Sequence, residues 1–234
     1  MTEERRRFLA AATALGIGTL ALVPGEIRGD DKKDQPEEEA GATEDLMREN
    51  GVLNRILLIY EEGLRRLRAR EDVPPDVFHK PATLVRKFVE DYHEKLEENF
   101  IFPEFEKARK LVDLVTGLKK QHEAGRKVTD VILRNAVADQ FRKEDARQEL
   151  VRSCEAFIRM YRPHEAREDT VLFPSQHKVF SAKELKDLGE QFEKEEDRLF
   201  GEEGFEKVVD QVAGLEKKLG IYDLDQFTPR LKGK

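Results

Sequence analysis

Residues 93–103 of this chain read HEKLEENFIFP, and residues 164–174 read HEAREDTVLFP. Both stretches follow the pattern H-E-x-x-E-x-x-x-aliphatic-F-P without a gap, a match that chance does not readily produce even in a chain rich in glutamate. A histidine and a glutamate four residues apart lie on one face of a helix, one turn from each other. The repeated stretch therefore predicts two helices that each present an imidazole and a carboxylate together.

Apolar residues recur at helical spacing around these two blocks. A first helix is predicted from Thr43, as its N-cap, to about Arg70, and further helices are expected up to Pro103, over about 109–137 and over about 142–172. Each of the four apolar stripes contains one special polar residue, namely Asn50, His93, His122 or His164. Long helices joined by short loops favour an all-α, up-down-up-down four-helix bundle.

The pattern continues beyond the bundle. After an N-cap at Ser181, a charged helix is expected to about Leu199 and a further helix to Leu219. These extra C-terminal helices are predicted to pack on the bundle instead of forming a domain of their own. The domain organisation that we predict is a bundle over residues 43–178 with a C-terminal helical extension over residues 179–234.

The start of the chain has the features of an export signal. Arg5-Arg6-Arg7 precedes an apolar run of about sixteen residues, which is short for a membrane span and suits a signal peptide. The pattern R-R-x-F-L resembles the twin-arginine signal, which implies bacterial export of a folded protein to the periplasm. An ordinary secretory signal or a membrane anchor on the extracytoplasmic side is the alternative. We predict a signal peptide or anchor over residues 1–25 and a disordered linker over residues 26–42.

Composition narrows the class of function. The chain has 234 residues, of which 38% are hydrophobic and 39% charged, with no tryptophan, which suits long, well-solvated helices. The net charge of −7, with both signs interleaved, argues against nucleic acid as a partner. The single cysteine, Cys154, excludes an intramolecular disulfide and a cysteine-based metal site, and its place on an apolar stripe predicts a small core residue.

The polar residues on the inward stripes need compensation. Buried carboxylates and imidazoles are costly without a partner, and the stripes carry no matching lysines or arginines. A divalent or trivalent metal ion is the natural compensation for His93, Glu97, His122, His164 and Glu168. The alternative is a buried His–Glu hydrogen-bonded network without metal.

The types of ligand indicate which metal is expected. Imidazole nitrogen and carboxylate oxygen without thiolate suit iron, manganese or zinc. Two glutamates on opposed helices can bridge two ions that three histidines cap, and such dinuclear sites usually hold iron or manganese. The spacing differs from the Glu-x-x-His of ferritin-like di-iron bundles and from the H-E-x-x-H of zinc peptidases, so hydrolase chemistry loses support.

Taken together, these residues resemble the hemerythrin-like (HHE cation-binding) domain family. The two H-E-x-x-E blocks, His122 and the run Asp45-Leu46-Met47-Arg48-Glu49 carry the resemblance, which covers roughly residues 43–200. It implies a four-helix bundle with a non-haem di-iron centre that binds O2 or NO, or senses iron or oxygen. The metal ligands that it implies are His93, Glu97, His122, His164 and Glu168.

One position departs from the family pattern. The first family ligand is a histidine directly after Arg-Glu on the first helix, and this chain has Asn50 there. Asparagine is a weak oxygen donor, so one metal ion is expected to be loosely bound, to have an extra open position, or to be missing. Glu49 or Asp197 could substitute for the lost ligand. The departure weakens the case for reversible O2 carriage and favours redox chemistry with peroxide or NO.

Three hypotheses follow. The first is an exported di-metal protein that binds O2 or NO or senses redox or iron state. The second is a peroxidase- or oxidase-like di-metal enzyme that uses the coordination position opened by Asn50. The third is a structural or adaptor protein with a decayed site, in which the charged C-terminal helices bind a protein partner.

Overall fold

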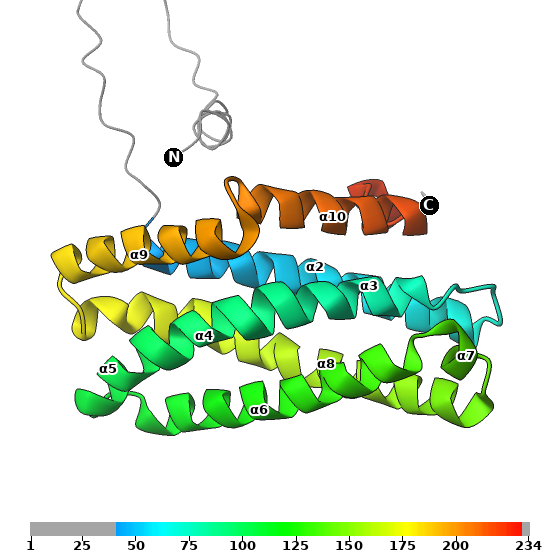
Figure 1. The fold of residues 1–234 in the computed structure, drawn as a ribbon, viewed down its shortest axis with the longest axis horizontal. Coiled ribbons are helices and arrows are strands. Elements are labelled where there is room, and N and C mark those ends of the chain that lie inside the picture. The colour runs from blue at the N-terminus through cyan, green and yellow to red at the C-terminus, as the bar shows by residue number, and fades with distance from the viewer. Residues whose placement is uncertain (1–40, 231–234) are drawn as a thin grey trace, which may run out of the picture. The chain divides into compact units, whose positions relative to one another are not determined.

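The computed structural model describes residues 41–230 (Figure 1), and the signal peptide, anchor and most of the linker predicted above lie outside these residues. Within residues 41–230 every regular element is a helix, so the chain has the all-α fold that the sequence predicted. No helix in this range is long and apolar enough to cross a membrane.

Four long helical segments run alternately up and down the bundle, as Figure 1 shows. The first is α2 (Ala42–Arg68) and the third is α6 (Val112–Asn135), followed by the short α7 (Ala138–Phe141). The second combines α3 (Asp76–Leu84), the π-helical η1 (Val85–His93), α4 (Glu94–Leu96), the π-helical η2 (Glu97–Ile101) and α5 (Phe102–Lys107). The fourth combines α8 (Glu144–Arg167), the π-helical η3 (Glu168–Leu172) and the 3-10 helix η4 (Phe173–Lys178).

The inward stripe of α2 explains why the bundle forms. This stripe recurs at helical spacing, and all its members are buried except Leu67, which is only partly covered by the core: Leu46, Asn50, Leu53, Leu57, Tyr60, Leu64 and Leu67. Tyr60 meets the edge of the Phe157 ring at 5.7 Å, which joins α2 to α8 through aromatic packing. Cys154 is fully buried beside these residues, as its apolar stripe predicted, and burial raises the pKa of its thiol.

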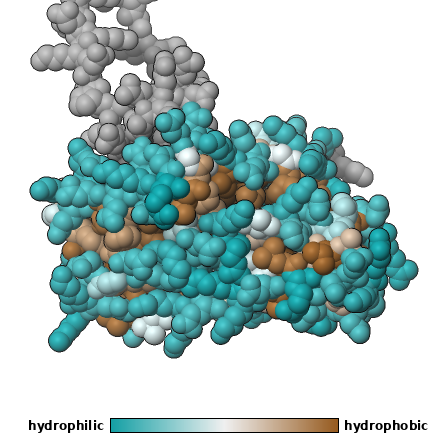
Figure 2. Space-filling model, in the orientation of Figure 1, coloured by the Kyte–Doolittle hydropathy of each residue, from teal (hydrophilic) through white to brown (hydrophobic). Residues whose placement is uncertain are grey.

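The C-terminal helices α9 (Ala182–Phe200) and α10 (Gly204–Leu219) contact α2. Ser181 caps α9 in a capping box with Glu184, as the sequence predicted. Arg55 on α2 binds Glu216 on α10 through two hydrogen bonds of 3.0 and 2.6 Å. Figure 2 shows apolar side chains gathered in the seam between these helices and the bundle. The short 3-10 helix η5 (Leu224–Gln226) follows.

Two local predictions were wrong. Pro103 does not end the second bundle helix, which continues to Lys107, because Pro103 lies in the first turn of α5, directly after the wider π turn of η2. Thr43 is not the N-cap of α2. The helix begins at Ala42 with Gly41 as N-cap, and the Thr43 hydroxyl donates instead to Gln176 Oε1 at 2.6 Å.

Candidate metal centre

The two repeated blocks coincide with changes of helical register. His93 ends the π-helical η1 and Glu97 begins the π-helical η2, while Glu168 begins the π-helical η3. A π turn inserts one residue into a helix and often occurs at functional sites, because it turns side chains away from their regular α-helical direction. In both blocks, the glutamate four residues after the histidine, Glu97 or Glu168, is the first residue of such a turn.

The structure brings all the predicted ligand residues together. His122 on α6 and His164 on α8 join the two glutamates in the bundle core, and each of these side chains is buried. Three groups have ligand atoms within 4.8 Å of one another: His122 with His164 and Glu168, His93 with Glu97 and Glu168, and Glu94 and Glu98 with His122. Glu168 is shared by the first two groups, so these two have the form of a dinuclear site.

Short distances connect the two groups. His164 Nε2 lies 2.8 Å from Glu168 Oε1, and His122 Nε2 lies 3.4 Å from Glu97 Oε2. His93 Nε2 lies 3.8 Å from Glu97 Oε2. The two Nε2 atoms of His122 and His164 are 3.3 Å apart. Nitrogen and oxygen ligand atoms therefore point into one small volume in the centre of the bundle.

Each imidazole is oriented through its other nitrogen. His93 Nδ1 lies 2.7 Å from Glu49 Oε2, His122 Nδ1 lies 3.1 Å from Glu98 Oε1, and His164 Nδ1 lies 2.9 Å from Gln121 Oε1. An oxygen acceptor at Nδ1 requires a proton there and leaves the lone pair at Nε2, as in histidines that bind metal ions. The sequence analysis missed Glu98 and Gln121, whose positions become significant only once the rotation of each helix is known.

The buried polar atoms without partners show whether these residues fit a metal ion. With Nδ1 protonated, the facing Nε2 atoms of His122 and His164 both carry lone pairs. The Nε2 atom of His93 and both carboxylate oxygens of Glu97 are buried without hydrogen-bond partners. A buried polar atom without a partner costs about 1–3 kcal/mol, and more if it is charged. A cation among these atoms removes the whole set of unpaired groups, so the residues present fit a metal site.

The two carboxylates differ in protonation. Burial and the nearby charge of Glu168 raise the pKa of Glu97 well above its ordinary value. Burial works in the same direction at Glu168, but when the imidazoles are protonated, the charge and hydrogen bond of His164 and the charges of His122 and His93 outweigh it and lower the pKa of that carboxyl to about 2. Glu168 therefore keeps its charge among the imidazoles, whereas Glu97 resists ionisation until a further cation is near.

Asn50 enters the site as a hydrogen-bond donor. Its amide nitrogen donates to Glu168 Oε2 at 3.2 Å and to Asp169 Oδ1 at 3.0 Å. The residue that replaces the family's first histidine thus holds the shared carboxylate in place. Of the two suggested substitutes, Glu49 binds the far side of His93, and Asp197 is exposed on α9, which places it outside the site.

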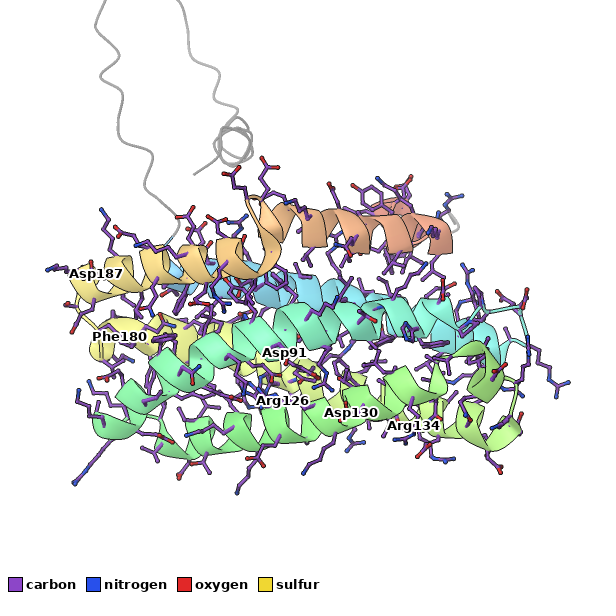
Figure 3. All side chains as sticks on the ribbon, viewed as in Figure 1. Asp91, Arg126, Asp130, Arg134, Phe180 and Asp187 are labelled. Carbon is purple, nitrogen blue, oxygen red and sulfur yellow. The ribbon has the colours of Figure 1, made fainter. Side chains whose placement is uncertain are left out.

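An arginine beside the site corrects a further expectation. The sequence suggested no inward cation, yet the Arg126 side chain on α6 contacts both Glu94 Oε2 and Glu98 Oε1 at 2.7 Å (Figure 3). The Tyr161 hydroxyl donates to Glu94 Oε1 at 2.8 Å. Protein groups therefore already pair with Glu94, the second residue of the first block. This leaves the three central histidines, together with Glu97 and Glu168, for metal ions.

A helical bundle with two buried His/Glu groups that share a carboxylate in its core has the features of a cation-binding protein. The chain belongs to the hemerythrin family, because residues 41–175 match the hemerythrin HHE cation-binding domain. It is 49% identical over 232 residues to an uncharacterized protein of Mycobacterium bovis and to uncharacterized proteins of two Mycobacterium tuberculosis strains, with 96% of this chain and 91% of each relative covered. No solved structure matches the chain.

Proposed function

We propose that this protein binds two non-haem iron ions in the bundle core and uses them to bind O2 or NO, or to sense redox or iron state. The observation that carries this proposal is the pair of buried His/Glu groups that share Glu168. His122, His164 and Glu168 would hold one ion, and His93, Glu97 and Glu168 the other. Manganese or zinc is compatible with the same ligands.

Bound iron would supply reversible coordination or reduction of a small oxidant, and the protein supplies the surroundings. Partners at Nδ1 keep each Nε2 atom directed inward. The amide of Asn50 lies beside Glu168, where the family pattern has an imidazole, so an ion held there would lack one nitrogen ligand whose place a diatomic molecule or peroxide would take.

Metal analysis tests the proposal. Protein purified after expression in iron-supplemented medium is expected to contain up to two iron ions per chain, with near-ultraviolet charge-transfer absorption after oxidation. His122→Ala is expected to lose most of the iron. His79→Ala, at a histidine outside the site, is the matched control and retains the iron. Iron-free protein whose thermal stability does not change when ferrous ion is added anaerobically contradicts the proposal.

A second candidate is a peroxidase- or oxidase-like enzyme, which the absence of an imidazole ligand at Asn50 favours. Turnover of hydrogen peroxide with an organic electron donor is then expected from the iron-loaded protein and is lost in Glu97→Ala. Reversible O2 or NO binding without turnover would assign the protein to the first function instead.

We also propose export through a twin-arginine signal, on the basis of the R-R-x-F-L pattern at Arg5-Arg6-Arg7-Phe8-Leu9. Fusion of the full chain to a reporter that is active only in the periplasm tests this proposal. Replacing Arg5 and Arg6 together by lysine should retain the reporter in the cytoplasm, and an undiminished periplasmic signal contradicts the twin-arginine assignment.

A further inference from the structure

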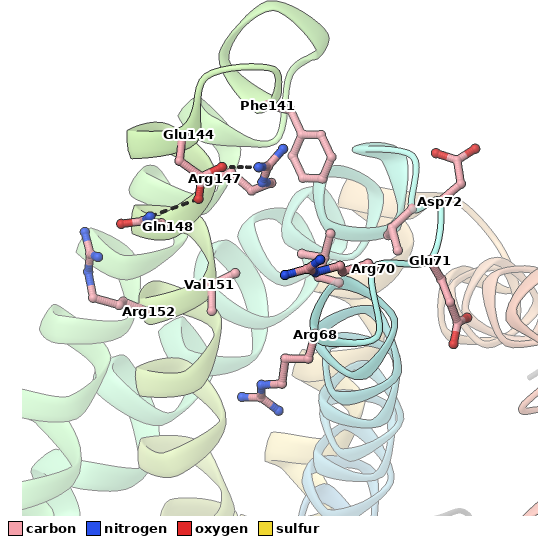
Figure 4. A pocket seen from close by; sticks show the side chains of 12 residues that line it. Arg68, Arg70, Glu71, Asp72, Phe141, Glu144, Arg147, Gln148, Val151 and Arg152 are labelled. Carbon is pink, nitrogen blue, oxygen red and sulfur yellow. Dashed lines mark hydrogen bonds and ion pairs between the residues drawn. The ribbon is translucent and has the colours of Figure 1, made fainter.

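A pocket of about 730 Å³ opens at the end of the bundle where α2 ends and α8 begins (Figure 4). Val151 of this pocket lies about 20 Å along α8 from His164, at a rise of about 1.5 Å per residue. The pocket is therefore separate from the metal centre. Its volume is in the range of sites that hold small organic molecules, about 300–1,000 Å³.

The lining combines an apolar floor with arginines. Leu67, Val73, Phe141 and Val151 supply the apolar surface, and the arginines are Arg68, Arg70, Arg147 and Arg152. Arg147 is paired with Glu144, and Arg68 with Glu155. Within residues 41–230, the guanidinium group of Arg70 has no hydrogen bond or ion pair with a carboxylate, and that of Arg152 has only a longer-range electrostatic interaction with Glu149. Figure 4 shows the carboxylates of Glu71 and Asp72 directed away from the side where Arg147 and Gln148 lie.

Arg70 occupies an unusual backbone position. Its φ is 57°, in the left-handed region, and it follows the last turn of α2. The Arg70 amide donates to Leu67 O and the Glu71 amide to Arg66 O, which closes the helix with the turn that glycine usually forms. This conformation is unfavourable for residues other than glycine. The fold alone thus favours glycine here, whereas the chain places at the pocket a guanidinium that no carboxylate within residues 41–230 pairs with.

We propose that this pocket binds a small organic anion with an aromatic or apolar body. The acid group of the ligand pairs with the guanidinium of Arg70, and Arg152 adds a second positive charge. The body of the ligand packs against Phe141 and Val151. Arginine is suited to carboxylate, sulfonate and phosphate groups because its planar N–H groups match their oxygens in pairs.

Isothermal titration with 2-naphthoate, and with the neutral 2-naphthamide of the same shape, tests the proposal on the full chain. Saturable one-site binding of 2-naphthoate is expected, with 2-naphthamide bound at least about tenfold more weakly, since a hydrogen bond to a charged group contributes about 1.5–3 kcal/mol. Arg70→Gly should weaken 2-naphthoate binding by a similar factor. This variant keeps the left-handed turn, so it is not expected to unfold the protein.

Arg109→Gly is the matched control. Arg109 also has a left-handed φ, 55°, and its amide donates to Glu106 O at the end of α5, outside the pocket. The control removes the same charge from the same kind of turn and should leave 2-naphthoate binding unchanged. The proposal is overturned by absence of saturable binding to the wild type at millimolar concentration, by wild-type affinity in Arg70→Gly, or by equal loss in the two variants.

Discussion

At the scale of single residues, Asn50 is the position at which the candidate metal centre departs from the family pattern. Its amide contacts the shared Glu168 and Asp169. An imidazole at this position adds a nitrogen ligand close to the same carboxylate. The chemistry of the two ions is therefore expected to be unequal, with the ion on the side of His93 bound more weakly.

Asn50→His is predicted to raise the metal content toward two ions per chain and to strengthen binding of the weaker ion by about tenfold or more. Competition against a coloured chelator measures this change. Asn54→His, one turn further along α2, is the control, because Asn54 donates to the Asn50 carbonyl and is exposed. Unchanged metal content in Asn50→His means that this position does not face the ions.

Gly125 is a second residue whose size matters. A Cβ atom at this position would lie 2.0 Å from the Tyr161 hydroxyl oxygen, far inside the contact distance. Gly125→Ala must displace the ring and break its hydrogen bond to Glu94. We predict a loss of about 2–4 kcal/mol in the free energy of unfolding, from overpacking and an unpaired buried group.

Gly117→Ala provides the comparison in the same helix. Nothing lies within 4 Å of a Cβ atom there, so the change should stabilise α6 by up to about 1 kcal/mol. Urea unfolding of both variants measures the difference. Similar stability of the two alanine variants would show that the Tyr161 contact is not tightly packed.

At the scale of elements, the interface between η1 and α6 contains a buried acid away from the metal ligands. Glu90 on η1 accepts a hydrogen bond from the Thr129 hydroxyl at 2.5 Å and pairs with Arg86 at 3.0 Å. Burial raises the pKa of Glu90 to about 7, and the charge of Glu94 adds to this, although Thr129, Arg86 and Arg126 act in the opposite direction. Burial raises the pKa of Tyr60 on α2 and of Tyr161 on α8, and the charge of Glu90 raises both further.

This raised pKa predicts a pH dependence of stability. The folded protein holds the Glu90 proton more tightly than the unfolded chain, whose pKa is about 4.5. The contribution of Glu90 is therefore complete below pH 4.5 and is lost as the pH rises to about 7. Glu90→Gln removes this loss and should be more stable than the wild type at pH 8 by up to about 3 kcal/mol. Urea unfolding of metal-free protein from pH 4.5 to 8 checks this, and parallel curves contradict it.

The sequence predicted helices well because apolar residues recurred three and four residues apart on each stripe, as in Leu53, Leu57 and Tyr60. The repeat placed an imidazole and a carboxylate on each of two helices. A bundle brings such helices face to face, so the meeting of these side chains followed from the repeat alone. Local hydrogen bonding was beyond this reasoning. The π turns at Glu97 and Glu168, and the reach of Arg126 across the helix interface, depend on packing between segments that are distant in the sequence.

At the scale of the whole molecule, the candidate metal centre joins side chains from three helical segments of the bundle, which supply His93, His122 and His164, and Asn50 of α2 contacts Glu168 within it. Metal ions should therefore stabilise the fold as a unit. A ligand that binds only the folded state adds about 2.7 kcal/mol at a free concentration of one hundred times its Kd.

Removal of the metal with a chelator is predicted to lower the Tm by several degrees and to leave the helical circular dichroism largely intact, because the apolar core remains. Differential scanning calorimetry of iron-loaded and metal-free samples measures the shift. His122→Ala should show no such shift in Tm, because the variant lacks a metal ligand and therefore has little metal to lose. An equal shift in His122→Ala would place the stabilising ion elsewhere.

The enclosure of Cys154 in α8 has a practical consequence for studying motion in this protein. The only thiol of the chain is fully buried and resists ionisation, so a thiol reagent can react only after the core has opened. The rate at which an aromatic disulfide reagent labels Cys154 thus reports how often the bundle opens, without any added probe. Comparing that rate before and after iron loading gives the free energy by which the metal holds the helices together.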